Sequence, residues 1–191
     1  MTVLLIDSED AFAHNLFQAV ASLKARVVLE TSERLDFKRI GALKPRHLIV
    51  ARDWTQSHEI LDRFHGHIPI LGIGPGHHAI ARQVGGRIIA APSIQHGTTV
   101  GINHEGVALF EGLTNPFNAA CYHAKVVDPE AVPTTLTITA RGPDGSIMAV
   151  SHRDAPTYGI QFRPESIGTP QGTDLLANFL GVQREPSQEA A

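Results

Sequence analysis

Residues 68–82 read Ile-Pro-Ile-Leu-Gly-Ile-Gly-Pro-Gly-His-His-Ala-Ile-Ala-Arg, and this stretch decides the fold. An apolar run, residues 68–73, leads into a glycine-rich corner, and a helix-like segment, residues 77–82, follows it. Strand, sharp turn and helix in this order form the elbow on which α/β enzymes present a nucleophile. The tip of this elbow is Gly74, which has no side chain, and the next residue, Pro75, has no N–H. The sequence therefore predicts an elbow without its reactive atoms.

Around the elbow, apolar runs alternate with helical patterns through the first half of the chain. The expected strands are residues 3–6, 25–29, 47–50 and 68–73, and the expected helices are residues 11–23, 37–43, 57–64 and 77–84. This alternation is typical of an α/β fold with a mostly parallel central sheet and helices on both faces.

The second half of the chain has a different pattern, in which short apolar runs are separated by turns such as residues 142–145, Gly-Pro-Asp-Gly. The expected strands are residues 88–90, 98–102, 118–127, 135–141, 147–151 and 159–162. We expect these strands to form a smaller mixed or antiparallel sheet.

Composition limits the classes of function. The chain has 191 residues, 42% hydrophobic and 18% charged, with a formal net charge of −3. It has no basic surplus that would indicate nucleic acid binding, and no apolar segment approaches the roughly 20 residues that span a bilayer. Its single cysteine, Cys121, cannot form an internal disulfide, which fits a cytoplasmic protein. We expect one domain, residues 1–182, followed by a polar, disordered tail, residues 183–191.

Further segments, in order along the chain, resemble one enzyme family. They are Leu4–Leu16 with Asp10, Phe12 and Asn15, Gly85-Gly86, His96-Gly97, Gly112-Leu113, Asn115-Pro116-Phe117, Tyr122-His123, Gly159–Ser166 and the helix Leu175–Leu180. Together with the elbow they resemble the class I glutamine amidotransferases, most closely component II of anthranilate synthase and aminodeoxychorismate synthase. The resemblance covers nearly all of residues 3–180 and implies a flavodoxin-like fold.

In that family a cysteine attacks the side-chain amide of glutamine, a histidine acts as base and acid, and a glutamate orients the histidine. The family's elbow motif, Gly-Ile/Val-Cys-Leu-Gly-His-Gln, is matched here by residues 72–78, so Gly74 stands at the nucleophile position. The Gln-Phe-His-Pro-Glu motif is matched by residues 161–165, which places Arg163 at the histidine position. The resemblance thus implies that only the orienting glutamate, Glu165, is present.

Other departures from the family pattern affect the oxyanion hole. Pro75 cannot donate the N–H that normally follows the nucleophile, and an arginine at position 163 holds its proton and cannot act as a base. The family's glycine-rich oxyanion loop is matched by residues 51–57, which are shorter and contain no glycine. The resemblance therefore implies a degenerate site. The former elbow and oxyanion residues would be Gly72, Pro75 and Gly76, and those of the former glutamine pocket His78, Tyr122 and His123.

Two uses of the altered site stay open at this stage. Arg163 either fills the old pocket and pairs with Glu165, or joins His77 and the N-terminus of the helix after Pro75 in binding a carboxylate or phosphate. Cys121 is either a buried packing residue or, with His123 two positions along a strand, a relocated nucleophile pair. The 11 histidines show no convergent set of ligands, and we expect no metal or cofactor.

The leading hypothesis is a catalytically inactive glutaminase-like subunit. It would bind and stabilise or regulate a chorismate-utilising synthase that resembles component I of anthranilate or aminodeoxychorismate synthase. An alternative is an amidotransferase-like fold that has been repurposed for another reaction or for anion binding at the old site. A third possibility is a self-associating protein without a synthase partner.

Overall fold

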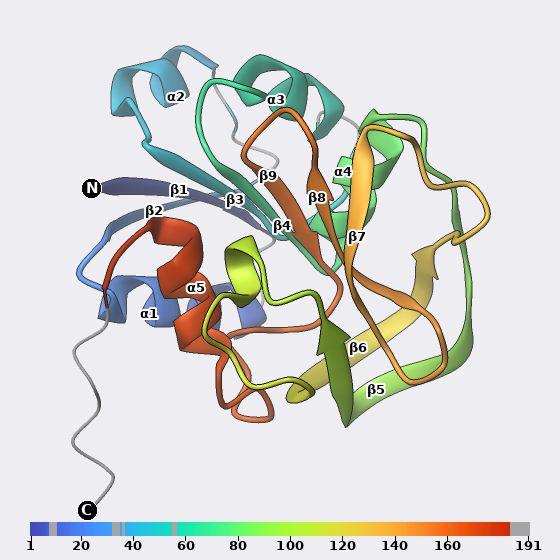
Figure 1. Ribbon diagram of the computed structural model, residues 1–191. Helices are drawn as coiled ribbons and strands as arrows, with labels where there is room; N and C mark the ends of the chain where they lie inside the picture. Colours follow the sequence, from blue (N-terminus) through green and yellow to red (C-terminus); the bar gives the residue numbers. More distant parts are fainter. Residues whose placement is uncertain (8–10, 32–34, 36, 55–56, 184–191) are drawn as a thin grey trace, which may run out of the picture.

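The computed structural model describes residues 1–7, 11–31, 35, 37–54 and 57–183, and the elements below belong to this part of the chain (Figure 1). The strands are β1 (Thr2–Asp7), β2 (Arg26–Thr31), β3 (His47–Val50), β4 (Ile70–Ile73), β5 (Ile88–His104), β6 (Phe117–Val127), β7 (Leu136–Arg141), β8 (Ile147–His152) and β9 (Thr157–Ile160). The helices are α1 (Ala11–Ser22), α2 (Phe37–Leu43), α3 (Ser57–Phe64), α4 (Pro75–Gln83), α5 (Gly172–Leu180) and a 3-10 turn (Ala108–Phe110).

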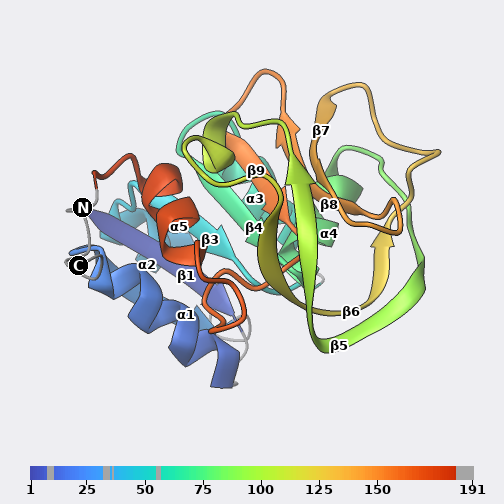
Figure 2. The ribbon, with the colours of Figure 1, turned by 60° about the horizontal axis from the view of Figure 1, so that its bottom comes forward.

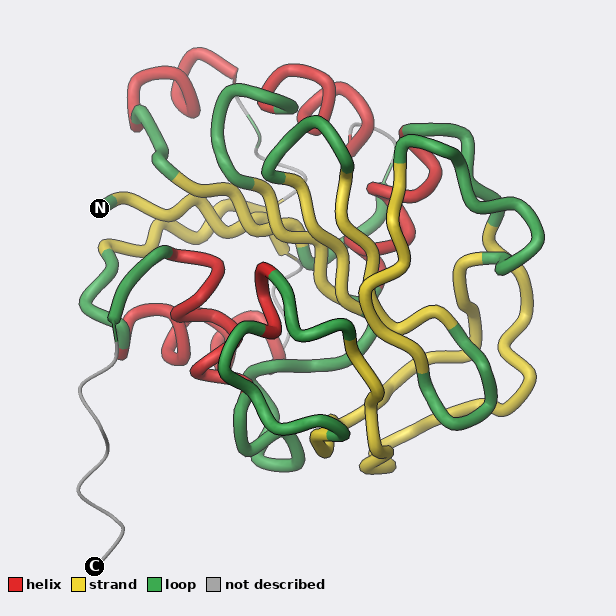
Figure 3. The backbone as a smooth tube through the Cα atoms, in the orientation of Figure 1, coloured by secondary structure: helices red, strands yellow, loops and turns green. Residues whose placement is uncertain are grey.

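The nine strands form one sheet in the order β2-β1-β3-β4-β9-β8-β7-β5-β6. The strands from β2 to β9 in this order pair in parallel, as the alternating pattern predicts. The remaining strands, β8, β7, β5 and β6, are antiparallel and extend the central sheet from β9, as the smaller antiparallel part that the sequence predicts. Figure 3 shows these strands lying to one side of the parallel half.

The length of β5 differs from the sequence-based prediction. The sequence predicts two short strands, residues 88–90 and 98–102, but the structure has a single strand of 17 residues. β5 pairs with β6 in a long ribbon that curves away from the parallel strands (Figure 2). Its register shifts twice along this ribbon, and these bulges break the apolar alternation that would have revealed one continuous strand.

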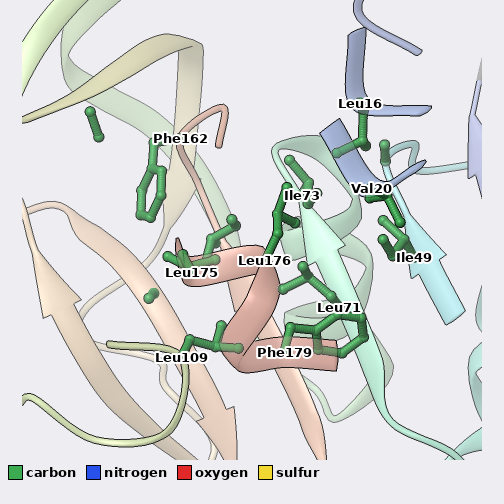
Figure 4. Close-up of a cluster of buried hydrophobic side chains, with 14 of the residues drawn as sticks. Leu16, Val20, Ile49, Leu71, Ile73, Leu109, Phe162, Leu175, Leu176 and Phe179 are labelled. Atoms are coloured by element: carbon green, nitrogen blue, oxygen red, sulfur yellow. The ribbon is translucent and has the colours of Figure 1, made fainter. Parts of the chain in front are cut away.

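Helices cover both faces of the parallel strands. α1 and α5 lie on one face, where Leu16 and Phe179 pack against Leu71 in a cluster of buried side chains (Figure 4). α2, α3 and α4 cover the other face, where Ile60 packs with Leu48. Successive residues of each strand therefore contribute to opposite cores, which holds the end of β4 and the start of α4 rigidly.

Many element ends differ from the predicted ones by one or two residues, and three of these lie at the elbow or at the strand beside it. α4 begins at Pro75, two residues before the predicted start, since proline is well suited to the first helical position. β4 begins at Ile70, and β9 ends at Ile160, so that Gln161 and Phe162 belong to the following loop. The family landmark Asp10 and the predicted tail from residue 184 onward lie outside the described residues.

None of the described helices combines the length and the hydropathy that crossing a bilayer requires.

Candidate functional site

The predicted elbow is present between β4 and α4. Gly74 has φ 55° and ψ −111°, a backbone conformation that residues with side chains rarely adopt. Its N–H donates to the Ile160 carbonyl of β9 at 2.8 Å, and its own carbonyl accepts from the His77 N–H at 3.1 Å. Glycine adopts this conformation without the strain that a nucleophile at the same position would carry.

The neighbouring glycines allow the backbone around the elbow to pack closely. A Cβ on Gly76 would lie 1.8 Å from the Val50 carbonyl oxygen of β3, and one on Gly72 would lie 2.4 Å from the Gly76 carbonyl oxygen. No side chain fits at either distance. The close approach of β3, β4 and the first turn of α4 therefore depends on these two glycines.

Arg163 fills the space in front of the elbow. Its guanidinium carbon lies 3.8 Å from the point where a Cβ on Gly74 would stand, and 4.8 Å from the centre of the Phe12 ring, which it covers. Its Nη1 lies 3.5 Å from Oε1 of Glu165, and the two side chains are 12% and 0% exposed. The guanidinium thus lies between the tip of the elbow, the Phe12 ring and the Glu165 carboxylate.

The backbone around Arg163 is fixed to β6 and to the next loop. The Arg163 N–H donates to the Ala120 carbonyl at 2.9 Å, and the Thr169 hydroxyl donates to the Arg163 carbonyl at 2.7 Å. The same Thr169 oxygen accepts from the Ala120 N–H at 2.9 Å. These bonds fix the backbone from which the Arg163 side chain extends.

The three residues predicted for the former glutamine pocket do not all face the same space. Tyr122 lies on the side of Arg163. Its ring centre is 5.1 Å from that of Phe12, and the Arg163 guanidinium lies over the Phe12 ring. His123 is the next residue of β6 and faces the opposite side, because neighbouring strand residues alternate. His78 donates from Nε2 to the Gln161 side-chain oxygen at 2.8 Å, so the structure gives it a protein partner.

His77 is fully buried against Gly159 of β9, where a Cβ would lie 2.4 Å from its Nδ1. Neither of its ring nitrogens has a hydrogen-bond partner among the described residues. Burial lowers the pKa of His77 well below its usual value, and the nearby His78 and His123 lower it further. His77 is consequently neutral at pH 7 and adds no positive charge beside Arg163.

The loop that the sequence aligns with the family's oxyanion loop is bound to α4. Asp53 forms an ion pair with Arg82, and the Ser57 hydroxyl donates to the Trp54 carbonyl at 2.6 Å. Residues 55–56 of this loop lie outside the described residues. Sequence reasoning missed the Asp53–Arg82 pair, since its partners are 29 positions apart and neither belongs to a motif.

The structure gives no support to a nucleophile at Cys121. Its side chain is buried in the core, and its thiol donates weakly to the Ala119 carbonyl at 3.7 Å. Burial raises the pKa of this thiol to about 12, with a smaller contribution from Asp144, so the thiolate is not formed near neutral pH. Among the residues that the structure describes, no three His, Cys, Asp or Glu side chains are grouped to hold a metal ion.

Comparison with known proteins shows the family of the chain. The family model for class-I glutamine amidotransferases matches residues 4–182. The chain is 38% identical to aminodeoxychorismate/anthranilate synthase component 2 of Bacillus subtilis, covering 96% of this chain and 97% of the relative. It is also 38% identical to aminodeoxychorismate synthase component 2 of Escherichia coli, covering 93% and 98%.

Solved structures show the same fold. A protein from Thermoplasma acidophilum described as belonging to GMP synthase superimposes with a TM-score of 0.79 at 21% identity, covering 95% of this chain and 92% of that one. A glutamine amidotransferase from Thermotoga maritima superimposes with a TM-score of 0.66 at 12% identity, covering 86% and 76%. At these identities the likeness concerns the fold alone.

Proposed function

This chain belongs to the class-I glutamine amidotransferase family, and from that premise we propose that it is a glutaminase-like subunit that does not hydrolyse glutamine. It binds a chorismate-utilising synthase of the anthranilate or aminodeoxychorismate type and stabilises or regulates it. The partner is inferred from the relatives, whose names describe them as component 2 of such synthases.

One observation carries the proposal. Gly74 holds the backbone conformation of a nucleophile elbow but has no side chain, and the Arg163 guanidinium stands 3.8 Å from where its Cβ would be. Covalent attack on an amide needs a nucleophile and a base that takes its proton. Neither group is present at these positions, and loss of a single such group usually costs on the order of 10⁴ to 10⁶ in rate.

The oxyanion hole supports the same conclusion. Pro75 has no N–H to donate at the elbow, and the loop at residues 51–54 is bound to α4 through Asp53 and Arg82. Even without a triad, an intact oxyanion hole leaves some catalysis. With this hole altered as well, we expect no measurable residual glutaminase activity.

The test is product formation by the chorismate-utilising synthase of the same organism, with and without this chain, on glutamine or on ammonium salt. Stimulation with ammonium but not with glutamine supports the proposal. Turnover on glutamine that depends on this chain would overturn the assignment of Gly74, Pro75 and Arg163 as inactive. No effect under either condition would count against the synthase partner and favour a self-associating protein.

A second candidate, anion binding at the former active site, is favoured by one contact. The Arg163–Glu165 distance of 3.5 Å is longer than the roughly 2.7–2.9 Å of a charge-assisted hydrogen bond, and Arg163 Nη1 has no hydrogen-bond partner among the described residues. A carboxylate or phosphate could use this donor. Titration with acetate and with phosphate, followed through the NMR signal of the Arg163 side chain, tests anion binding at this site. An Arg163 signal that does not shift at millimolar anion concentration excludes it.

A further inference from the structure

A cavity of 330 Å³ lies on the side of β6 that faces away from Arg163. Its lining comes from β5, β6, β8 and the turn between β7 and β8, and consists of Ser93, Gln95, Val100, His123, Gly142, Pro143, Asp144 and Met148. The volume falls within the usual range for small-molecule sites. None of these residues belongs to the elbow or to the Arg163–Glu165 pair.

A bulge in β5 shapes this cavity. Ala90 pairs with Lys125 of β6, and the next paired residue of β5, Gln95, stands opposite His123. Five steps along β5 therefore match two along β6, and the residues between them, Ser93 included, leave the ladder. The bulge brings the polar side chains of Ser93 and Gln95 to the cavity at the position of His123.

His123 supplies a hydrogen-bond acceptor at this cavity. Its side chain is 9% exposed, and its Nδ1 has no hydrogen-bond partner among the described residues. Burial lowers the pKa of His123, against a smaller opposing effect of the Asp144 carboxylate. The imidazole is therefore neutral at pH 7, and one of its ring nitrogens accepts hydrogen bonds.

Asp144 is the charged residue of the lining, and its turn holds it in position. Its Oδ1 accepts from the Ser146 N–H at 3.0 Å, and the turn is closed by a bond from the Gly142 N–H to the Ser146 carbonyl at 2.9 Å. The walls beside it are apolar and come from Val100, Pro143 and Met148. The cavity thus combines an apolar surface with a carboxylate and a neutral imidazole.

We propose that this cavity binds a small protonated amine with an apolar body, its ammonium group placed between Asp144 and His123. The Asp144 carboxylate only accepts hydrogen bonds, and the neutral His123 ring offers one acceptor nitrogen, so a ligand that donates to both fits the cavity; the negative charge of Asp144 selects a cation over an anion. The apolar part lies against Val100 and Met148. This site is independent of the proposed synthase partner and of the loss of glutaminase activity.

The two methionines of the chain, Met1 and Met148, allow a direct test. Protein labelled with ¹³C at the methionine methyls gives one signal from the cavity wall and one from the N-terminus as an internal reference. We expect benzylamine to shift the Met148 signal saturably at millimolar concentration, while benzyl alcohol and benzoate bind at least about threefold more weakly.

The matched variants are D144N and D154N. D144N keeps the oxygen that accepts from Ser146 but removes the charge, whereas D154N removes the same charge from the exposed turn between β8 and β9. We expect D144N to weaken benzylamine binding about threefold or more and D154N to leave it unchanged. An unmoved Met148 signal, equal binding of benzyl alcohol, or equal effects of the two variants would each overturn the proposal.

Discussion

Gly74 and Arg163 face each other in front of the elbow, and a thiol introduced at position 74 reports on that arrangement. In G74C the sulfur would stand beside the guanidinium, which favours the thiolate and lowers the thiol pKa. We expect rapid alkylation by iodoacetamide at neutral pH without glutamine hydrolysis, and a stability loss of about 1–2 kcal/mol from the positive φ. Mass spectrometry after timed alkylation measures the rate.

The buried Cys121 is the internal control for this experiment, since its pKa of about 12 keeps it protonated. The double variant G74C/R163M should react more slowly than G74C, because the positive charge is gone. Equal rates in the two variants would contradict the stated role of Arg163.

The buried His77 makes the stability of the protein depend on pH. Its pKa in the folded protein lies well below the value of 6.5 for an ordinary histidine, so below pH 6.5 the unfolded chain binds a proton that the folded chain excludes. The contribution of His77 to the free energy of unfolding is therefore fully present above pH 6.5. It is lost as the pH falls below 6.5, by up to about 1.4 kcal/mol per pH unit. Urea unfolding between about pH 5 and pH 8 measures the slope.

The variant H77Q should show a shallower decline of stability with falling pH, because the group that excludes the proton is absent. His14 is exposed on α1, so H14Q serves as the matched control. If H77Q and H14Q gave the same slope as the unaltered protein, the pH dependence would have to arise from other groups, among them the partly buried His78 and the buried His123.

At the scale of single elements, prediction from sequence succeeds where one local pattern decides the structure. α2, β3 and α3 have the predicted ends, since each is a short apolar or amphipathic run between polar turns. β5 is mispredicted because its bulges interrupt the alternation, and a bulge is set by pairing with β6 rather than by local sequence.

The candidate site divides in the same way. Gly74, Arg163 and Glu165 follow from motif positions, whereas the stacking of Arg163 on Phe12 joins residues far apart in the sequence. The hydrogen bond from His78 to Gln161 likewise could not be predicted from the sequence, because it connects α4 to the loop after β9. Local patterns thus locate the elbow, and tertiary packing decides what fills the space in front of it.

The close contact between β3 and the first turn of α4 gives a prediction about stability. In G76A the added Cβ would lie 1.8 Å from the Val50 carbonyl oxygen, so the helix must move away from the strand. We expect a loss of at least about 3 kcal/mol in the free energy of unfolding, as in severe overpacking of a core. The matched control is G41A in α2, where a Cβ meets nothing within 4 Å.

G41A should be neutral or stabilising by about 0.4–1 kcal/mol, because alanine favours helix and restricts the unfolded chain. Urea unfolding of both variants gives the comparison. A small effect of G76A would mean that α4 tolerates displacement at its first turn, and that the elbow is less rigidly built than its distances indicate.

For the whole molecule, the arrangement of sheet and helices is that of the family, while the proposal is that the groups for glutamine hydrolysis have been replaced. Two buried cores on either side of the sheet support the fold away from the tip of the elbow, where a Cβ on Gly74 would meet only the Arg163 side chain. A glutaminase-like subunit of the proposed kind acts on its synthase through a surface that it presents to that partner. The loop after Glu165, at the former active site, is one such surface, since Ile167 there is fully exposed.

This surface carries the last prediction, which concerns the proposed synthase partner. We expect I167D to weaken binding to the synthase about tenfold or more, because a charge replaces an apolar contact at the centre of the interface. V107D is the matched control, since Val107 is also apolar and 52% exposed but lies in the loop after β5. Surface plasmon resonance with immobilised synthase measures both affinities. If V107D weakened binding while I167D did not, the interface would lie on the β5 side of the molecule, away from the former active site.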